Sequence, residues 1–188
     1  GAFLKGMRAA GMPAVGKHFP GHGWVEADSH VAIPVDERSL AEIRRADLLP
    51  FKNLQHQLAG MMPAHVIYSQ VDAAPAGFSK VWLQDILRNE LNYQGVLFSD
   101  DLSMAGAQVA GNAAQRVLAA LTAGCNVGLL CNDRAAAEQG LVALQNECVI
   151  PCSQLNVMYG QYIAQHDFQQ HPRWQTARQA LNALITNN

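Results

Sequence analysis

Residues 95–101 read Gly-Val-Leu-Phe-Ser-Asp-Asp, a short apolar run that ends on two acids. Apolar and polar residues do not alternate in the run, which is typical of a parallel strand that is buried on both faces. Similar apolar runs cover residues 13–19, 58–63 and 127–131, with helix-forming stretches between them. The repeated order of strand and helix predicts an α/β fold with a four-stranded parallel sheet.

The stretches between the strands carry apolar residues at helical spacing. The predicted helices cover residues 2–10, 37–57, 79–91, 112–123 and 175–185, and two more begin near 133 and 153, with a short extended piece at 30–35. Pro50 should end or kink the helix that contains it, because proline cannot donate the helical hydrogen bond. Ser79, Asp133 and Ser153 are the residue types that cap helix N-termini, and we expect each to begin a helix.

Polar side chains gather where the predicted strands end. Lys17 and His18, His65, Asp100 with Asp101, and Asn132 lie at or just after strand ends, and none of the strands is followed by a glycine-rich nucleotide motif. Ligands bind at this edge both in open doubly wound sheets and in (β/α)8 barrels. A whole barrel takes roughly 250 residues, so this chain of 188 residues would be part of one.

Composition limits the classes of function. The chain is 49% hydrophobic with a net charge of −2, which suits one domain over residues 1–188 and gives no electrostatic sign of nucleic acid or anionic membrane as a partner. No apolar stretch approaches the roughly 20 residues that span a bilayer, and no signal peptide is visible. The four cysteines form no C-x-x-C pair, so we interpret them as reduced and expect a cytoplasmic protein.

Two groups of polar residues suggest catalysis. Asp100 should emerge at the ligand-binding edge, where a carboxylate can attack an electrophilic carbon, whereas Asp101 should point elsewhere because side chains alternate along a strand. Asp28 and His30 are two positions apart, so in an extended loop the carboxylate could orient the imidazole as an acid or base. A capping aspartate and a solvated loop histidine are the simpler structural interpretations.

Other classes of function remain open on the same residues. His18, His22, Asp28 and His30 could hold a divalent metal in a hydrolase, although their spacing matches no compact motif. The chain could also be a non-catalytic fragment whose exposed strand edges pair with another chain.

Three stretches in the same order resemble family 3 glycoside hydrolases. They are Lys17-His18-Phe19-Pro20-Gly21-His22-Gly23 with Asp28-Ser29-His30, then Met62-Pro63-Ala64-His65-Val66-Ile67-Tyr68, then Phe98-Ser99-Asp100-Asp101-Leu102-Ser103-Met104. More narrowly, they are similar to the bacterial β-N-acetylhexosaminidases of peptidoglycan recycling. The resemblance covers roughly residues 1–145.

This resemblance implies a fold, a reaction and a site. The fold would be the C-terminal half of a TIM-like (β/α)8 barrel, about four strand–helix units, with extra C-terminal helices. The reaction would be retaining removal of terminal β-linked N-acetylglucosamine from muropeptides, with Asp100 as nucleophile and His30, assisted by Asp28, as general acid/base. Lys17, His18 and His65 would bind the sugar, and neither a metal nor an organic cofactor would be needed.

The same resemblance raises two further expectations. A related exo-glycosidase acting on unmodified β-glucosides would use a carboxylate elsewhere as its acid/base, so the pair of Asp28 and His30 argues against that alternative. Half a barrel would leave unpaired strand edges and an exposed apolar sheet face. We therefore expect a fragment that is inactive alone and needs the missing N-terminal half barrel, another partner or self-association.

Overall fold

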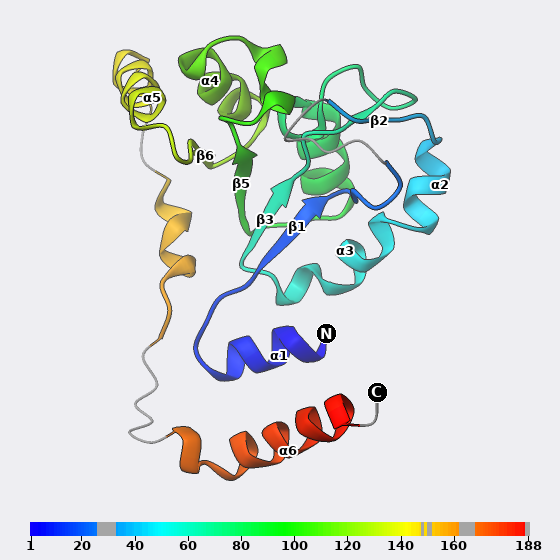
Figure 1. The fold of residues 1–188 in the computed structure, drawn as a ribbon. Coiled ribbons are helices and arrows are strands. Elements are labelled where there is room, and N and C mark those ends of the chain that lie inside the picture. The colour runs from blue at the N-terminus through cyan, green and yellow to red at the C-terminus, as the bar shows by residue number, and fades with distance from the viewer. Residues whose placement is uncertain (26–32, 148, 150–151, 162–167, 187–188) are drawn as a thin grey trace.

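The computed structural model describes residues 1–25, 33–147, 149, 152–161 and 168–186. Strands and helices alternate through most of the described chain (Figure 1). In order, the elements are α1 (Ala2–Ala9), β1 (Val15–Phe19), β2 (Val35–Asp36), α2 (Leu40–Arg45), α3 (Leu48–Leu54), η1 (Gln55–Gln57), β3 (Gly60–Pro63), β4 (Ile67–Tyr68), η2 (Ala76–Phe78), η3 (Val81–Glu90), β5 (Val96–Asp101), η4 (Ala105–Ala110), α4 (Ala113–Ala123), β6 (Val127–Leu129), α5 (Arg134–Asn146), η5 (Ser153–Met158), η6 (Phe168–Gln170) and α6 (Pro172–Thr186).

The main sheet has four parallel strands in the order β1-β3-β5-β6, which confirms the predicted α/β class and its four strands. Gly60 of β3 pairs with Val15 of β1 on one side and with Val96 of β5 on the other, and Phe98 of β5 pairs with Val127 of β6. A second, two-stranded parallel sheet joins β2 to β4. The extended piece predicted over 30–35 is seen only in part, because residues 30–32 lie outside the described residues.

The helix predicted over 37–57 is wrong as one element. The structure has α2, α3 and η1 there, and the break falls at Ala46 and Asp47 rather than at Pro50. Pro50 is the third residue of α3, where its missing N–H costs no helical hydrogen bond. The true start of α2 is a capping box between Ser39 and Glu42, which fixes its first turn.

Two of the three predicted caps are confirmed. The Ser79 hydroxyl accepts a hydrogen bond from the Trp82 amide just before η3, and the Asp133 carboxylate accepts one from the Ala136 amide in α5. Ser153 does not cap a helix, because it is the first residue inside the short η5 turn and no side-chain cap forms there. The other predicted helices are confirmed with small shifts at their ends.

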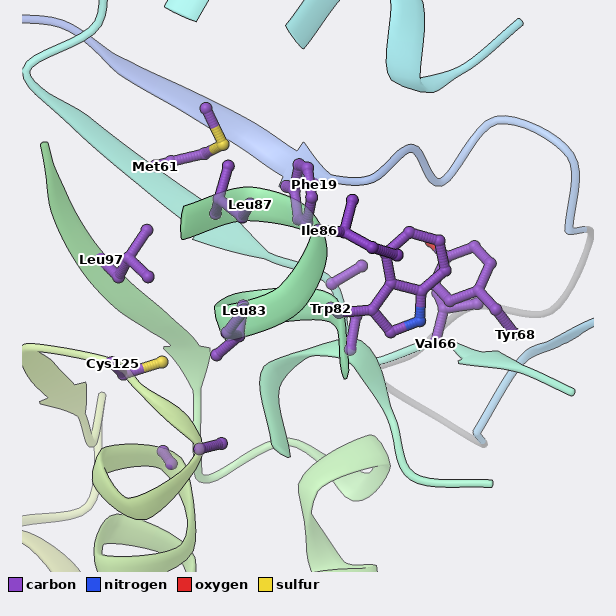
Figure 2. Packing of buried hydrophobic residues seen from close by; sticks show 14 of the residues in the cluster. Phe19, Met61, Val66, Tyr68, Trp82, Leu83, Ile86, Leu87, Leu97 and Cys125 are labelled. Carbon is purple, nitrogen blue, oxygen red and sulfur yellow. The ribbon is translucent and has the colours of Figure 1, made fainter. Parts of the chain in front are cut away.

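The core lies between the sheet and η3. Figure 2 shows side chains of η3, including Leu83 and Leu87, packed beside Phe19, Met61 and Leu97 from three neighbouring strands. All five side chains are fully buried, and burying one such side chain stabilises a fold by about 1.5–3 kcal/mol. The packing fixes the strands, and with them the carboxyl ends that carry the polar residues.

An aromatic cluster closes the core near the end of β1. The ring of Trp82 packs edge-on against Tyr68, with 4.9 Å between ring centroids, and against Phe19 at 6.0 Å. The ring of Phe51 reaches Phe19 from α3 at 5.6 Å. The segment that follows β1 therefore begins from a rigid base (Figure 2).

The two terminal helices are poorly covered. Neither α1 nor α6 has a buried residue, and Figure 1 draws both apart from the main sheet. Their exposed apolar side chains include Phe3, Leu181, Leu184 and Ile185. No helix in the described part of the chain is both long and apolar enough to cross a membrane.

Candidate active site

Asp100 lies near the carboxyl end of β5 and is 7% exposed. Its Oδ1 atom accepts a hydrogen bond from the Asp101 amide at 2.8 Å. Its Oδ2 atom lies 3.7 Å from the Nε2 atom of His18, which comes from β1. The strand ends therefore bring a carboxylate and an imidazole together from positions 82 residues apart, as the sequence predicts for this edge of the sheet.

Asp101 has a different environment. Its Oδ1 atom accepts hydrogen bonds from the Ser103 amide at 2.9 Å and from the Cys131 amide at 3.0 Å, and the Ser103 hydroxyl donates as well. Burial alone would raise the pKa of Asp101, but these hydrogen bonds outweigh burial and lower it. The carboxylate is occupied in joining β5 to the end of β6, while Asp100 keeps its Oδ2 atom for other contacts.

His18 is held in a site that disfavours its charged form. Burial lowers the pKa of His18 despite the opposing charge of Asp100, and the nearby ammonium of Lys17 and the imidazoles of His22 and His65 lower it further. The imidazole is therefore neutral near pH 7 and can both donate and accept a hydrogen bond.

Lys17 is exposed, and no described residue forms a hydrogen bond or an ion pair with its ammonium group. Lys17 directly precedes His18 on β1, and its charge is one of those that lower the pKa of His18. An ammonium group can donate hydrogen bonds to ligand oxygens.

His65 is fully buried, and its ring stacks on Phe78 with 5.6 Å between centroids. Its Nε2 atom lies 3.1 Å from the carbonyl oxygen of Asp101, so it must be the donating nitrogen. Among the described residues its Nδ1 atom has no partner. Burial is the main cause that lowers the pKa of His65, against the opposing charge of Asp100. His65 supports the strand end that carries Asp100, and a contact with the sugar stays a prediction.

Asp28 and His30 lie outside the described residues, so the acid/base pair stays a prediction. The chain that leads to them is described as far as Val25. It passes His22, whose ring centroid lies 6.1 Å from that of His18.

No group of three or more His, Cys, Asp or Glu side chains is placed to hold a metal within the described ranges. The metal site considered from the sequence includes Asp28 and His30, so it remains untested by this geometry. Among the described residues, the site offers one imidazole and one carboxylate in contact, His18 and Asp100. That pair suits nucleophilic chemistry with an adjacent hydrogen-bonding partner.

Three supporting side chains, those of Ser99, Asn126 and Arg88, were not predicted as links between elements. The Ser99 hydroxyl accepts a hydrogen bond from the Leu129 amide at 2.8 Å and so links β5 to β6. The Oδ1 atom of Asn126 accepts from the Leu97 amide at 2.8 Å and lies 3.2 Å from an Arg88 nitrogen. The sequence does show polar residues in or beside apolar strands, which indicates that their side chains form hydrogen bonds. The spacing along the chain does not reveal which residue is the partner.

The fold and this site define an α/β protein with a buried carboxylate at the carboxyl edge of a parallel sheet. Residues 1–159 match the model of the glycosyl hydrolase family 3 N terminal domain. The chain therefore belongs to glycosyl hydrolase family 3.

The chain is also similar to several beta-hexosaminidases. The chain is 64% identical over 183 residues to a beta-hexosaminidase of Pseudomonas aeruginosa, covering 97% of this chain and 55% of that protein. It is 61% identical over 142 residues to a beta-hexosaminidase of Idiomarina loihiensis, covering 76% of this chain and 43% of the relative. The chain thus spans about half the length of the curated relatives it matches.

Solved structures are similar as well. NagZ from Neisseria gonorrhoeae in complex with N-trifluoroacetyl-D-glucosamine has a TM-score of 0.82 at 38% identity, covering 97% of this chain and 53% of NagZ. A family 3 beta-N-acetylglucosaminidase from Paenibacillus has a TM-score of 0.74 at 28% identity, covering 82% of this chain and 31% of that enzyme.

Proposed function

We propose that this chain carries the catalytic residues of a retaining exo-β-N-acetylglucosaminidase that acts on peptidoglycan fragments. The observation that carries the proposal is the carboxylate of Asp100, 93% buried at the carboxyl end of β5 and 3.7 Å from His18. The family and the 64% identity to a beta-hexosaminidase support the substrate class.

The proposed architecture is one domain over residues 1–188, the C-terminal half of a (β/α)8 barrel followed by extra helices. The strand order β1-β3-β5-β6 follows the chain without reversal. A doubly wound sheet would reverse its strand order at a switch point, whereas a barrel adds each strand beside the last. The coverage of 55% of the Pseudomonas aeruginosa relative supports a half of this kind.

The reaction begins with attack by an Asp100 oxygen on the anomeric carbon. The glycosidic C–O bond breaks as His30 gives its proton to the leaving oxygen, and a covalent glycosyl-enzyme forms. His30 then takes a proton from water, and the water oxygen displaces the Asp100 carboxylate from the same carbon. Two displacements retain the β configuration, and Asp28 keeps the His30 imidazole oriented for both transfers.

The remaining residues bind and support. Lys17 can donate to sugar hydroxyls, and neutral His18 can both donate and accept, so the two hold the sugar over Asp100. His65 is proposed to bind the sugar as well, and its contact with the carbonyl oxygen of Asp101 supports the strand end that carries Asp100. This mechanism uses no metal and no organic cofactor.

The active protein should be larger than this chain or an assembly of it. The edges of β1 and β6 have no further strand partner among the described residues, and apolar side chains of α1 and α6 are exposed. The missing N-terminal half barrel would cover these surfaces, and self-association is the other candidate. We therefore propose that the chain alone is inactive. We also propose muropeptides that contain N-acetylglucosamine as its substrates, a location in the cytoplasm, and neither membrane nor nucleic acid as a partner.

The test compares this chain alone, this chain co-expressed with the amino-terminal half of the Pseudomonas aeruginosa relative, and that relative intact. Each is assayed on a chromogenic β-N-acetylglucosaminide, a matching β-glucoside and a muropeptide, with and without a chelator, and product configuration is read by NMR. We expect hydrolysis of the N-acetylglucosaminides with retention, insensitive to the chelator, in the co-expressed sample. Inversion, loss with the chelator, or a preference for the β-glucoside would overturn the proposal.

A further inference from the structure

We propose that Arg38 is a positioning residue that fixes both ends of the segment carrying Asp28 and His30, an inference that rests on the proposed function. The segment follows β1 and leads into β2 (Val35–Asp36). Trp24 lies on its outgoing side and Asp36 on its returning side. The guanidinium of Arg38 contacts both of these residues.

The first contact is a bidentate hydrogen bond from Arg38 to the carboxylate of Asp36. The Nε atom of Arg38 donates to Oδ1 of Asp36 at 3.0 Å, and Nη2 donates to Oδ2 at 2.6 Å. The Asp36 carboxylate is 1% exposed and the Arg38 side chain 12%. Burial alone would raise the pKa of Asp36, but the hydrogen bonds from Arg38 outweigh it and lower that pKa. The pair is thus charged and well buried at the returning end.

The second contact is with Trp24 at the outgoing end. The Cζ atom of Arg38 lies 4.6 Å from the centroid of the Trp24 ring, within the range of a cation–π interaction. Trp24 is 64% exposed, so the core does not cover its indole, whereas the guanidinium of Arg38 lies over its ring.

The third contact extends the network to the start of the segment. Nη1 of Arg38 lies 2.6 Å from Oδ2 of Asp47. Asp47 packs against Gly21, where an added Cβ would come within 2.2 Å of the Cβ of Asp47, and where φ is +143°. The Tyr68 hydroxyl donates a hydrogen bond to the Gly21 carbonyl. The root of the segment is therefore held at Gly21, Trp24 and Asp36.

An arginine is needed for this combination. Its planar guanidinium presents one edge to a carboxylate, another nitrogen to a second carboxylate and a flat face to an aromatic ring, which an ammonium cannot do at once. A general acid must lie within hydrogen-bond reach of the leaving oxygen. Loosening the ends of the segment should therefore slow the steps that depend on proton transfer from His30.

The test compares Arg38→Lys with the unchanged protein and with Arg134→Lys as a matched control, in whichever form of the protein is active. Arg134 forms an exposed ion pair with Glu138 and is 92% exposed, so its change should be silent. The substrates are aryl β-N-acetylglucosaminides whose leaving groups range from good to poor. Hydrogen exchange is measured in parallel on the amides of residues 22–36 and of the four main strands.

We expect kcat/KM of Arg38→Lys to fall about 10²-fold for the poorest leaving group, the size typical of a misplaced catalytic group, and only a few-fold for the best. Exchange should rise in residues 22–36 and stay unchanged in the strands. Equal losses for all leaving groups, or unchanged exchange in that segment, would overturn the role of Arg38. Absence of hydrolysis in the unchanged protein would instead count against the proposed function. Hydrogen exchange would still test whether Arg38 fixes the ends of the segment.

Discussion

The Nε2 atom of His18 lies 3.7 Å from the Oδ2 atom of Asp100, although their strands, β1 and β5, are separated by β3. The contact spans the width of the central strand at the carboxyl edge of the sheet. The other oxygen of Asp100 is bonded to the Asp101 amide. Asp100 is thus oriented by the backbone on one side and leaves its second oxygen beside an imidazole, as a nucleophile requires.

Replacing Asp100 with Asn should abolish turnover while leaving the fold intact, because an amide of the same shape cannot form the glycosyl-enzyme. We expect kcat to fall at least about 10³-fold, or about 4 kcal/mol in activation free energy. Asp85→Asn is the matched control, since Asp85 is an exposed acid on η3. Substantial residual turnover by the Asp100 variant, with unchanged circular dichroism, would remove Asp100 from the nucleophile role.

Replacing Asp101 with Ala should mainly destabilise the protein. The change removes the acceptor of the partly buried Ser103 amide and of the exposed Cys131 amide, and each hydrogen bond of this kind contributes roughly 0.5–1.5 kcal/mol. Urea unfolding followed by tryptophan fluorescence measures the loss. Asp101→Asn keeps one acceptor oxygen and should lose less, so equal losses for the two variants would contradict this account.

The strands β3, β5 and β6 were predictable from the sequence because each begins as a continuous apolar run, as buried parallel strands do. The apolar signal is weaker in β1, which carries Lys17 and His18 before Phe19. The site edge was predictable too, because polar residues follow these runs and parallel strands end together. The separate directions of Asp100 and Asp101 followed from the alternation of side chains along a strand.

Other features depend on contacts that spacing does not reveal. The break between α2 and α3 was misplaced because proline in a first helical turn loses no hydrogen bond, so Pro50 gave no true stop signal. The two-residue strand β4 was missed because its pairing with β2 is long-range and too short to leave a pattern. The links from Asn126 to Leu97 and from Arg38 to Trp24 join residues whose proximity only the fold creates.

Stability should fall as the pH drops below about 6.5, the ordinary pKa of histidine. Burial lowers the pKa values of His65 and His18 in the folded state. The unfolded chain therefore takes up protons first, and stability that is complete above the unfolded pKa is lost as the pH falls below it. The buried carboxylate of Asp36 contributes separately. Because its pKa is lowered in the folded state, the stability it adds is present above the ordinary pKa of 3.8 and is lost as the pH falls below that value.

The His65→Gln variant tests the histidine part of this dependence. A glutamine amide can still donate to the Asp101 carbonyl but does not titrate. Urea midpoints measured from pH 7.5 to 4.5 should fall less steeply in the variant. His56→Gln is the control, since His56 is an exposed residue of η1. An unchanged slope in His65→Gln would show that His65 does not carry the acid sensitivity.

Replacing Asn126 with Asp should be tolerated, whereas replacing it with Ala should not. The Oδ1 atom of Asn126 accepts from the Leu97 amide at 2.8 Å and lies 3.2 Å from Nη2 of Arg88. A carboxylate can accept both contacts and adds an ion pair to Arg88, while alanine leaves the Leu97 amide unsatisfied at a cost of roughly 1–3 kcal/mol. Thermal unfolding of the two variants distinguishes them, with Asn89→Ala, an exposed amide of η3, as the control. If Asn126→Asp lost as much stability as Asn126→Ala, the side chain of Asn126 would not stabilise the protein as the acceptor for the Leu97 amide. Another contact would then have to fix the start of β5 beside Arg88.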